Sequence, residues 1–308
     1  MDQDYKKKLE EQGYRFIGEH SAIKTCEWKK KSLTNKGVCY KQKFYGINSH
    51  LCCQMSVAVN FCDEDCIFCW REHKNFSFEK IDDPNELLKN IPKAEKSLLS
   101  GLGGNEYIDK KKFSQAYNPI HFAISLTGES IYYPRINELI QEIHKNKGTT
   151  FLVTNGQSPS LLKKLTQPTQ LYISLAANSK EMFNNICKPS RKNGWELLIK
   201  SLDLLKVLKT RTTIRLTLIK GINMTEPEKY VEILEKASPK FIEVKAYMRV
   251  GASRNRLDTK NMPLHSEIKE FAKEICKYSS YRIIDEQKES RVILLMKENK
   301  DRYLNIYI

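Results

Sequence analysis

The sequence predicts an α/β fold: an open, partial (β/α)6 barrel of the TIM-like type with an extension at each end. After residue 55, six short apolar runs rich in β-branched and aromatic residues alternate with segments of helical periodicity. Such alternation is typical of parallel strands joined by right-handed helical crossovers. Because six units are fewer than the eight of a closed barrel, we expect a partial one, with its chemistry at the carboxyl ends of the strands.

The strands are expected where the apolar runs are short enough for a buried parallel sheet. Their ranges, in order, are Met55–Val59, Ile120–Leu126, Thr149–Val153, Leu171–Leu175, Thr212–Leu218 and Phe241–Ala246. Helices are expected between them, at Pro84–Leu99, Pro134–Asn146, Ser158–Leu165, Asn193–Leu208 and Glu226–Lys236. Pro134 suits the first turn of its helix, and Thr225 with Glu228 has the spacing of a capping box.

The chain outside this core differs in composition from the core. Residues 1–54 form a Lys-rich N-terminal extension that carries four cysteines, and residues 55–250 form the barrel core. Residues 251–308 form a C-terminal α/β extension, with a helix at Pro263–Tyr278 and strands at Tyr281–Ile284 and Val292–Met296. We expect the three parts to make one integrated catalytic domain, and a monomer, because no heptad pattern or long apolar edge invites assembly.

The charge of the chain points to a polyanionic partner. Lys and Arg number 52 against 37 Asp and Glu, which gives a formal net charge of +15. A basic balance of this size favours nucleic acid, although a Lys-rich proteome would also produce it. No long apolar segment predicts a membrane span, and no apolar stretch near Met1 predicts a secretory signal. We therefore expect a cytoplasmic protein whose nine cysteines serve metals rather than disulfides.

The most informative motif is a loop of three cysteines directly after the first expected strand. Cys62, Cys66 and Cys69 follow the spacing CxxxCxxC, with Phe68 and Trp70 as apolar neighbours. Three thiolates on one tight loop can hold three irons of a [4Fe–4S] cluster and leave the fourth iron open to a small molecule. The alternative is a zinc site, but zinc prefers four ligands, usually in two pairs.

This loop resembles the signature of the radical S-adenosylmethionine (SAM) enzymes. The resemblance implies that Cys62, Cys66 and Cys69 bind a [4Fe–4S] cluster whose open iron chelates SAM. Reduction of the cluster then cleaves SAM to methionine and a 5′-deoxyadenosyl radical. The cofactor would carry the difficult chemistry, and the protein would supply position and electrostatics.

Polar residues at the ends of later strands are the expected contacts to SAM. Thr127, Gly128 and Glu129 stand where the superfamily often has Gly-Gly-Glu, and their alternative is an ordinary βα turn. Asn155 follows the third strand and would contact the cofactor or shape the turn. Ser174 and Arg215 lie within strands. Arg215 needs a partner, which would be the SAM carboxylate or a protein carboxylate such as Glu243.

The N-terminal extension carries a second set of cysteines. Cys26, Cys39 and Cys52 are spaced by 13 residues each, and Cys53 could replace Cys52. Three converging thiols could hold a second [4Fe–4S] cluster with its own open iron. The alternatives are small core residues or a zinc site of all four. Cys187 and Cys276 match no motif and are interpreted as structural.

The full set of motifs is similar to the family of archaeal-type enzymes that make 4-demethylwyosine on tRNA. The similarity runs over nearly the whole chain, from Cys39-Tyr40-Lys41 through the cysteine loop to Thr127-Gly128-Glu129. It implies a substrate, tRNA-Phe with N1-methylguanosine at position 37, and condensation of the methyl carbon with a two-carbon unit from pyruvate. It also implies a separate flavodoxin- or ferredoxin-like electron donor, and assigns Cys26, Cys39 and Cys52 to the second cluster.

Two means of holding pyruvate remain open. The open iron of the second cluster could chelate pyruvate as a Lewis acid. A lysine could instead hold pyruvate as a Schiff base, which needs a desolvated amine. Lys41, two residues after Cys39, is the candidate for that role, and its alternative is one more surface lysine.

The segment after the sixth expected strand is the candidate RNA contact. Tyr247, Arg249, Arg254 and Arg256 lie on or beside a small, basic loop. Such a loop could admit a phosphate backbone and let a base stack on Tyr247. Two other functions are compatible with parts of the sequence. The first is a radical SAM enzyme that acts on a protein or peptide, and the second is a non-catalytic, zinc-stabilised RNA-binding protein.

Overall fold

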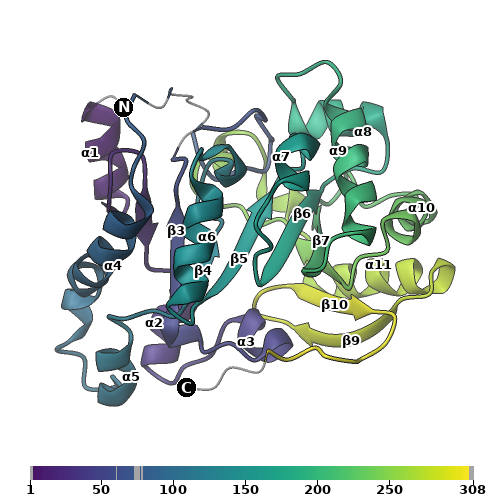
Figure 1. Cartoon of the computed structure of the whole chain (residues 1–308). Coiled ribbons are helices and arrows are strands. Elements are labelled where there is room, and N and C mark those ends of the chain that lie inside the picture. Colours follow the sequence, from purple (N-terminus) through teal and green to yellow (C-terminus); the bar gives the residue numbers. More distant parts are fainter. Residues whose placement is uncertain (1–2, 60, 73–76, 78, 305–308) are drawn as a thin grey trace. The chain divides into compact units, whose positions relative to one another are not determined.

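The computed structural model of the chain describes residues 3–59, 61–72, 77 and 79–304 (Figure 1). Two units can be distinguished, and each is described by itself. The first consists of Met1–Phe61, Lys74–Val153 and Tyr303–Ile308, and the second of Cys62–His73 and Thr154–Arg302. Within the described residues no helix is both long and apolar enough to cross a membrane.

The first unit contains five strands in sequence order. They are β1 (Tyr14–Phe16), β2 (Ala22–Lys24), β3 (Cys52–Ser56), β4 (His121–Ile124) and β5 (Thr149–Thr154). β1, β2 and β3 pair antiparallel, whereas β3, β4 and β5 pair parallel. The three parallel strands correspond to the first three expected from the sequence. β1 and β2 were not predicted, because runs of three residues are too short to show a period.

The helices of the first unit are α1 (Gln3–Glu11), α2 (Glu27–Leu33), α3 (Tyr40–Tyr45), α4 (Pro84–Leu99), α5 (Lys110–Gln115) and α6 (Ile136–Lys145). Most of them bury apolar residues, whereas α5 has no fully buried residue. α4 begins with Asp83, whose carboxylate accepts from the N–H groups of Asn85 and Glu86. Leu87 and Ile91 of α4 are buried, and α4 packs beside α6 (Figure 1).

The second unit also holds three parallel strands. They are β6 (Gln170–Leu175), β7 (Arg211–Leu218) and β8 (Phe241–Ala246). A hairpin of β9 (Arg282–Gln287) and β10 (Val292–Met296) adds to β8 antiparallel through β10, as the yellow arrows of Figure 1 show. The helices are α7 (Pro159–Lys163), α8 (Lys180–Cys187), α9 (Gly194–Asp203), α10 (Pro227–Ala237) and α11 (His265–Tyr278).

Two local expectations differ from the structure. β3 begins at Cys52 and ends at Ser56, three residues earlier than expected, because the stretch from Cys52 to Val59 carries no turn signal that marks where the strand begins or ends. The capping box at Thr225 is wrong. Glu226 precedes α10 with φ of 49°, makes no side-chain cap, and Pro227 begins the helix.

Candidate functional site

The cysteine loop belongs to the second unit, where backbone hydrogen bonds attach it to the end of α8. The amides of Asp65 and Ile67 donate to the carbonyl groups of Cys187 and Ile186 at 3.0 and 2.9 Å. A short antiparallel bridge joins Glu64 to Pro189. These bonds fix the backbone between Cys62 and Cys69. The three thiols are therefore carried by a defined backbone rather than by a flexible turn.

Two arginines hold the carbonyl groups of the same loop. Arg256 donates from Nε to the Ile67 oxygen at 3.1 Å, and from an Nη to the Cys69 oxygen. Arg71 donates to the Glu64 oxygen at 3.1 Å. The guanidinium of Arg256 therefore binds the loop, and its expected role as an RNA contact stays a prediction. No local pattern signals this, because 187 residues separate Arg256 from Cys69.

The electrostatics of the loop favour metal-bound thiolates once the cysteines lose their protons. Burial raises the pKa of the Cys69 thiol, and the guanidiniums of Arg71 and Arg256 act against that rise. A hydrogen bond with Cys187, together with burial, raises the pKa of the Cys66 thiol well above its usual range. Three cysteines, of which Cys66 is buried and Cys62 and Cys69 are half-buried, lie beside two fixed cations, which suits a cluster that needs thiolate ligands.

Asn155, which follows β5, also contacts the loop. Its Nδ2 donates to Asp63 Oδ1 at 2.8 Å and lies 3.8 Å from Cys62 Sγ, and its Oδ1 accepts from the Gln157 amide. The structure therefore places Asn155 against the first cysteine and within its own turn. This position supports a role in fixing Cys62, a role that the sequence did not suggest.

Arg215 of β7 has a protein partner. Its Nε donates to Glu243 Oε2 on β8 at 2.9 Å, and the guanidinium lies 4.7 Å from the centre of the Tyr172 ring. This is the protein carboxylate that the sequence offered as the alternative to SAM. Glu243 is fully buried, so the pair neutralises a charge that burial alone would make costly. Ser174 is half-buried on β6, beside Arg215 in the parallel register.

The candidate RNA contacts differ in exposure. Tyr247 is only 2% exposed, and its hydroxyl donates to Ser253 Oγ at 3.0 Å. The expected stacking of a base on Tyr247 is therefore wrong, because the ring packs in the core of the unit. Arg249 is half-buried and donates to the carbonyl groups of Leu257 and Arg254. Arg254 is exposed, and Arg256, like Arg249, is half-buried.

The turn Thr127-Gly128-Glu129 lies in the first unit, after β4. Gly128 has φ of 69°, and a Cβ there would lie 1.8 Å from the Ala58 carbonyl oxygen. The Glu129 amide donates to the Phe61 carbonyl at 2.6 Å, and the Glu129 carboxylate accepts from the Ile131 amide. Glu129 thus caps its own short helix, and Gly128 allows a close approach to the segment after β3.

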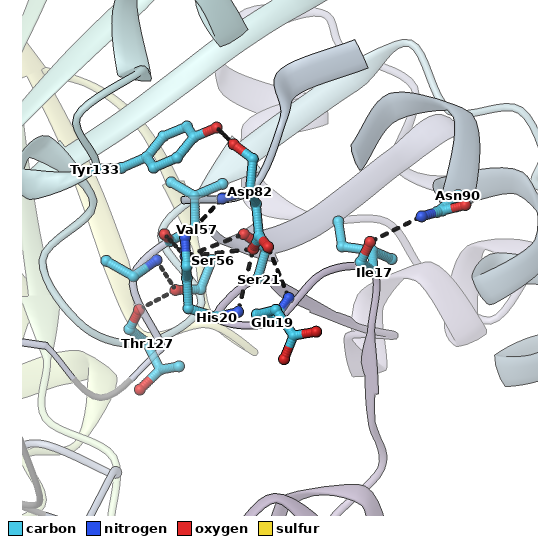
Figure 2. Close-up of polar contacts among 11 residues, drawn as sticks. Ile17, Glu19, His20, Ser21, Ser56, Val57, Asp82, Asn90, Thr127 and Tyr133 are labelled. Carbon is cyan, nitrogen blue, oxygen red and sulfur yellow. Dashed lines mark hydrogen bonds and ion pairs between the residues drawn. The ribbon is translucent and has the colours of Figure 1, made fainter. Parts of the chain in front are cut away.

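A polar network that the sequence reasoning missed supports this turn (Figure 2). Ser56 Oγ donates to the Thr127 carbonyl at 2.5 Å. His20 bonds through Nδ1 to the Val57 carbonyl at 2.8 Å and accepts through Nε2 from the Asp82 amide. The Asp82 carboxylate accepts from the amides of Glu19 and His20, and the Tyr133 hydroxyl donates to the Asp82 carbonyl. Hydrogen bonds of this kind restrict the backbone around the turn.

Replacing Gly128 by alanine is expected to destabilise the protein. The positive φ and the clash with the Ala58 carbonyl together should lower the free energy of unfolding by about 3 kcal/mol. Gly221→Ala is the matched control, since Gly221 has φ of 76° and open space around it. It should cost only about 1 kcal/mol. Denaturant midpoints measure the loss of stability in the two variants. Equal losses would contradict the close approach of Gly128 to the Ala58 carbonyl.

The N-terminal cysteines lie in the first unit, at the starts of three elements. Cys26 precedes α2 and accepts from the Lys29 amide at 3.4 Å, Cys39 precedes α3, and Cys52 opens β3. Burial, with the nearby thiols of Cys26 and Cys39, raises the pKa of Cys52 to about 12. Cys26 and Cys39 are thus both near enough to Cys52 to act on its charge.

Cys53 has a different environment. Its thiol is fully buried and bonds to Glu95, which forms an ion pair of 2.8 Å with Lys29. Successive side chains of a strand point to opposite faces, so Cys52 and Cys53 of β3 cannot face one site together. Cys52, whose charge responds to both Cys26 and Cys39, is the better third member of the set.

Lys41 is buried on α3. Only 6% of it is exposed, and its Nζ lies 4.9 Å from the centre of the Phe151 ring. Its ammonium also acts on the charge of Cys52. The alternative of a surface lysine is therefore wrong, and a desolvated amine beside the N-terminal thiols has the chemistry that a Schiff base needs.

Comparisons with known proteins identify the family of the chain. The family model of the Radical SAM superfamily matches residues 56–234, and the model for Wyosine base formation matches residues 236–297. The chain is 46% identical to the S-adenosyl-L-methionine-dependent tRNA 4-demethylwyosine synthase of Pyrococcus horikoshii, over 98% of this chain and 91% of that protein. It is 41% identical to the enzyme of the same name from Methanocaldococcus jannaschii, over 95% of each.

Solved structures extend the likeness to three dimensions. TYW1 with a lysine-pyruvate adduct bound is 39% identical, with a TM-score of 0.88 over 100% of this chain and 99% of that one. An archaeal TYW1 crystal structure is 36% identical, with a TM-score of 0.82 over 99% and 100%. These matches confirm the fold class expected from the sequence. The chain therefore belongs to the radical SAM superfamily and, within it, to the family of S-adenosyl-L-methionine-dependent tRNA 4-demethylwyosine synthases.

Proposed function

We propose that this protein is a radical SAM enzyme that converts N1-methylguanosine at position 37 of tRNA-Phe to 4-demethylwyosine, with pyruvate as the carbon donor. The observation that best supports the proposal is the presence of two sets of cysteines in one chain. One is a loop of three thiols with the superfamily's spacing, and the other is a converging N-terminal set beside a buried lysine. Relatives alike over nearly their whole length bear the name of this activity.

The loop residues would hold the cluster and its bound SAM. A [4Fe–4S] cluster with SAM supplies, on reduction, the 5′-deoxyadenosyl radical that starts the chemistry. Cys62, Cys66 and Cys69 provide the thiolates, while Arg71 and Arg256 hold the loop carbonyls and favour the charged form. The turn at Gly128 would offer its backbone and the Glu129 carboxylate to the SAM ammonium group.

The N-terminal set would hold a second [4Fe–4S] cluster and the donor. Cys26, Cys39 and Cys52 are the three ligands that the environment of Cys52 supports. For pyruvate we favour Lys41 over chelation by iron, because the amine is buried and a similar solved structure contains a lysine-pyruvate adduct. Condensation of the amine with the pyruvate ketone releases water and fixes the methyl carbon of pyruvate for attack.

The surface would hold the tRNA through its phosphates. The net charge of +15 suits a polyanion, and Arg254, with Arg249 beside it, offers guanidiniums to a phosphate backbone. We further propose that the protein acts as a monomer in the cytoplasm. There a separate flavodoxin- or ferredoxin-like protein would deliver the electron, because neither cysteine set is itself a source of reducing equivalents.

A labelling experiment tests the proposed function. Anaerobically reconstituted protein receives tRNA-Phe carrying N1-methylguanosine, SAM, a reductant and pyruvate labelled with ¹³C at C2 and C3. Mass spectrometry of the digested tRNA should find 4-demethylwyosine that contains both labelled carbons. Transcript with unmodified guanosine at position 37 is the control, and should give no product because it lacks the methyl carbon.

Other outcomes identify the competing functions. SAM cleavage without any change in the tRNA would overturn the proposed substrate and favour a protein or peptide. Bound zinc, without iron and without SAM cleavage, would overturn the enzyme and favour a zinc-stabilised RNA-binding protein.

A further inference from the structure

Cys66 has two buried neighbours that the proposed cluster does not use. They are Glu64, in the same loop, and Cys187, the last residue of α8. The sulfur atoms of Cys66 and Cys187 and a carboxylate oxygen of Glu64 lie within 4.8 Å of one another, and all three residues are buried. The Cys66 thiol donates to Glu64 Oε2 at 3.2 Å. Two thiols and a carboxylate thus meet at one point inside the second unit.

The backbone holds these three residues together. Glu64 pairs with Pro189 in an antiparallel bridge, and the Asp65 amide donates to the carbonyl of Cys187 itself at 3.0 Å. Lys188 follows in the left-handed region, with φ of 44°, and turns the chain back along the loop. These bonds fix the loop that carries Glu64 and Cys66 and the end of α8 that carries Cys187. Binding of a ligand by the three side chains would therefore not need to order a flexible segment.

The donors match the requirements of zinc. In a tetrahedral zinc site, bond lengths near 2.3 Å to sulfur and 2.0 Å to oxygen put two sulfurs about 3.8 Å apart, and sulfur and oxygen about 3.5 Å apart. The 4.8 Å span therefore needs a shift of only about 1 Å. Buried carboxylates are stable when they are paired or bind a metal, and Arg71, bonded to the Glu64 carbonyl, brings a positive charge to the same loop.

We propose that Glu64, Cys66 and Cys187 bind one thiophilic divalent ion of the zinc class when the loop carries no iron–sulfur cluster. Binding would release two thiol protons to solvent and place two thiolates and one carboxylate on the ion, with water in the fourth position. Neither the metal nor the sulfur changes oxidation state.

This site competes with the cluster for Cys66. That consequence rests on the proposed function, which makes Cys66 a cluster ligand, whereas the metal site itself does not. One zinc ion bound before reconstitution should slow uptake of iron by the loop, because Cys66 cannot serve both. In the Cys187→Ala variant, zinc should lose this effect.

Cobalt(II), which takes up zinc sites and reports thiolate ligation by its absorption, tests the site. The protein is used reduced and free of clusters, with Cys26, Cys39 and Cys52 changed to alanine so that the fully buried Cys53 is the one thiol left in the first unit. We expect one cobalt ion per chain, with a sulfur-to-cobalt charge-transfer band. Cys187→Ala should weaken binding at least tenfold. Cys69→Ala should leave affinity within about twofold, since Cys69 is a loop ligand outside the proposed site.

Cys276→Ala is the matched control, because Cys276 lies on α11 and belongs to neither set of ligands. Iron uptake by the Cys187→Ala loop, measured in parallel, shows that this variant folds. If the cobalt band is lost in Cys69→Ala and kept in Cys187→Ala, the loop thiols alone bind the ion and the inference is overturned. The inference is also overturned if no variant shows the band. Cobalt binding that depends on Cys187, in a protein that takes up no iron, would refute the proposed function and leave this inference standing.

Discussion

Replacing Cys62, Cys66 and Cys69 together by alanine is expected to lower the iron content of reconstituted protein from about eight to about four atoms per chain. The remaining cluster would belong to the N-terminal set, whose ligands lie in the other unit. Cleavage of SAM should fall to the background rate, because no cluster with an open iron for SAM remains. Iron and sulfide analysis, with chromatography of 5′-deoxyadenosine, measures both effects.

The reciprocal variant separates the two sets. Changing Cys26, Cys39 and Cys52 to alanine should also leave about four irons, but should retain cleavage of SAM while the tRNA stays unmodified. Cys276→Ala should change neither quantity. A different result would rule out the second cluster: about four irons per chain in the native protein and none in the variant that lacks Cys62, Cys66 and Cys69. The protein would then still be a radical SAM enzyme, but the N-terminal site proposed for pyruvate would be excluded.

Local pattern was enough to predict the parallel strands and the family signature of the cysteine loop. Strands such as Leu171–Leu175 and Phe241–Ala246 are short apolar runs between helices, and the structure has β6 and β8 there. The spacing of Cys62, Cys66 and Cys69 is likewise contained in eight consecutive residues. Because such signals depend only on near neighbours in sequence, they can be recognised without knowledge of the fold. The comparisons confirm the family that these signals indicated.

The roles of several site residues depend on contacts between distant segments, which no local pattern contains. Arg256 resembled a solvent-exposed RNA contact, but its partners are carbonyls of the cysteine loop. Tyr247 follows the alternation of side chains along a strand. This alternation predicts the face of the strand on which a side chain lies, but not whether that face is exposed. Cys187 matched no motif because its neighbour, Cys66, lies far back in the chain. Only the pair Arg215–Glu243 was foreseen, as an alternative, since a buried charge needs a partner.

Replacing Lys41 by methionine is expected to abolish formation of 4-demethylwyosine, with a loss of about 10³-fold or more, while cleavage of SAM continues. Methionine keeps a long apolar stem against Phe151 but has no amine to condense with pyruvate. Lys41→Arg should be equally inactive, because a guanidinium retains the charge and forms no Schiff base. The comparison therefore distinguishes a covalent role from an electrostatic one, and thermal unfolding of both variants checks that the fold persists.

Trapping of the adduct completes this test. Borohydride added to the native protein with labelled pyruvate should attach the label to the peptide that contains Lys41. Lys43→Ala is the matched control, since Lys43 lies on the same helix two residues later and is exposed. Its product yield and labelling should equal those of the native protein, because the exposed Lys43 amine lies outside the buried site proposed for pyruvate. Full product yield from Lys41→Met would exclude Lys41 and leave chelation by the iron of the second cluster as the means of holding pyruvate.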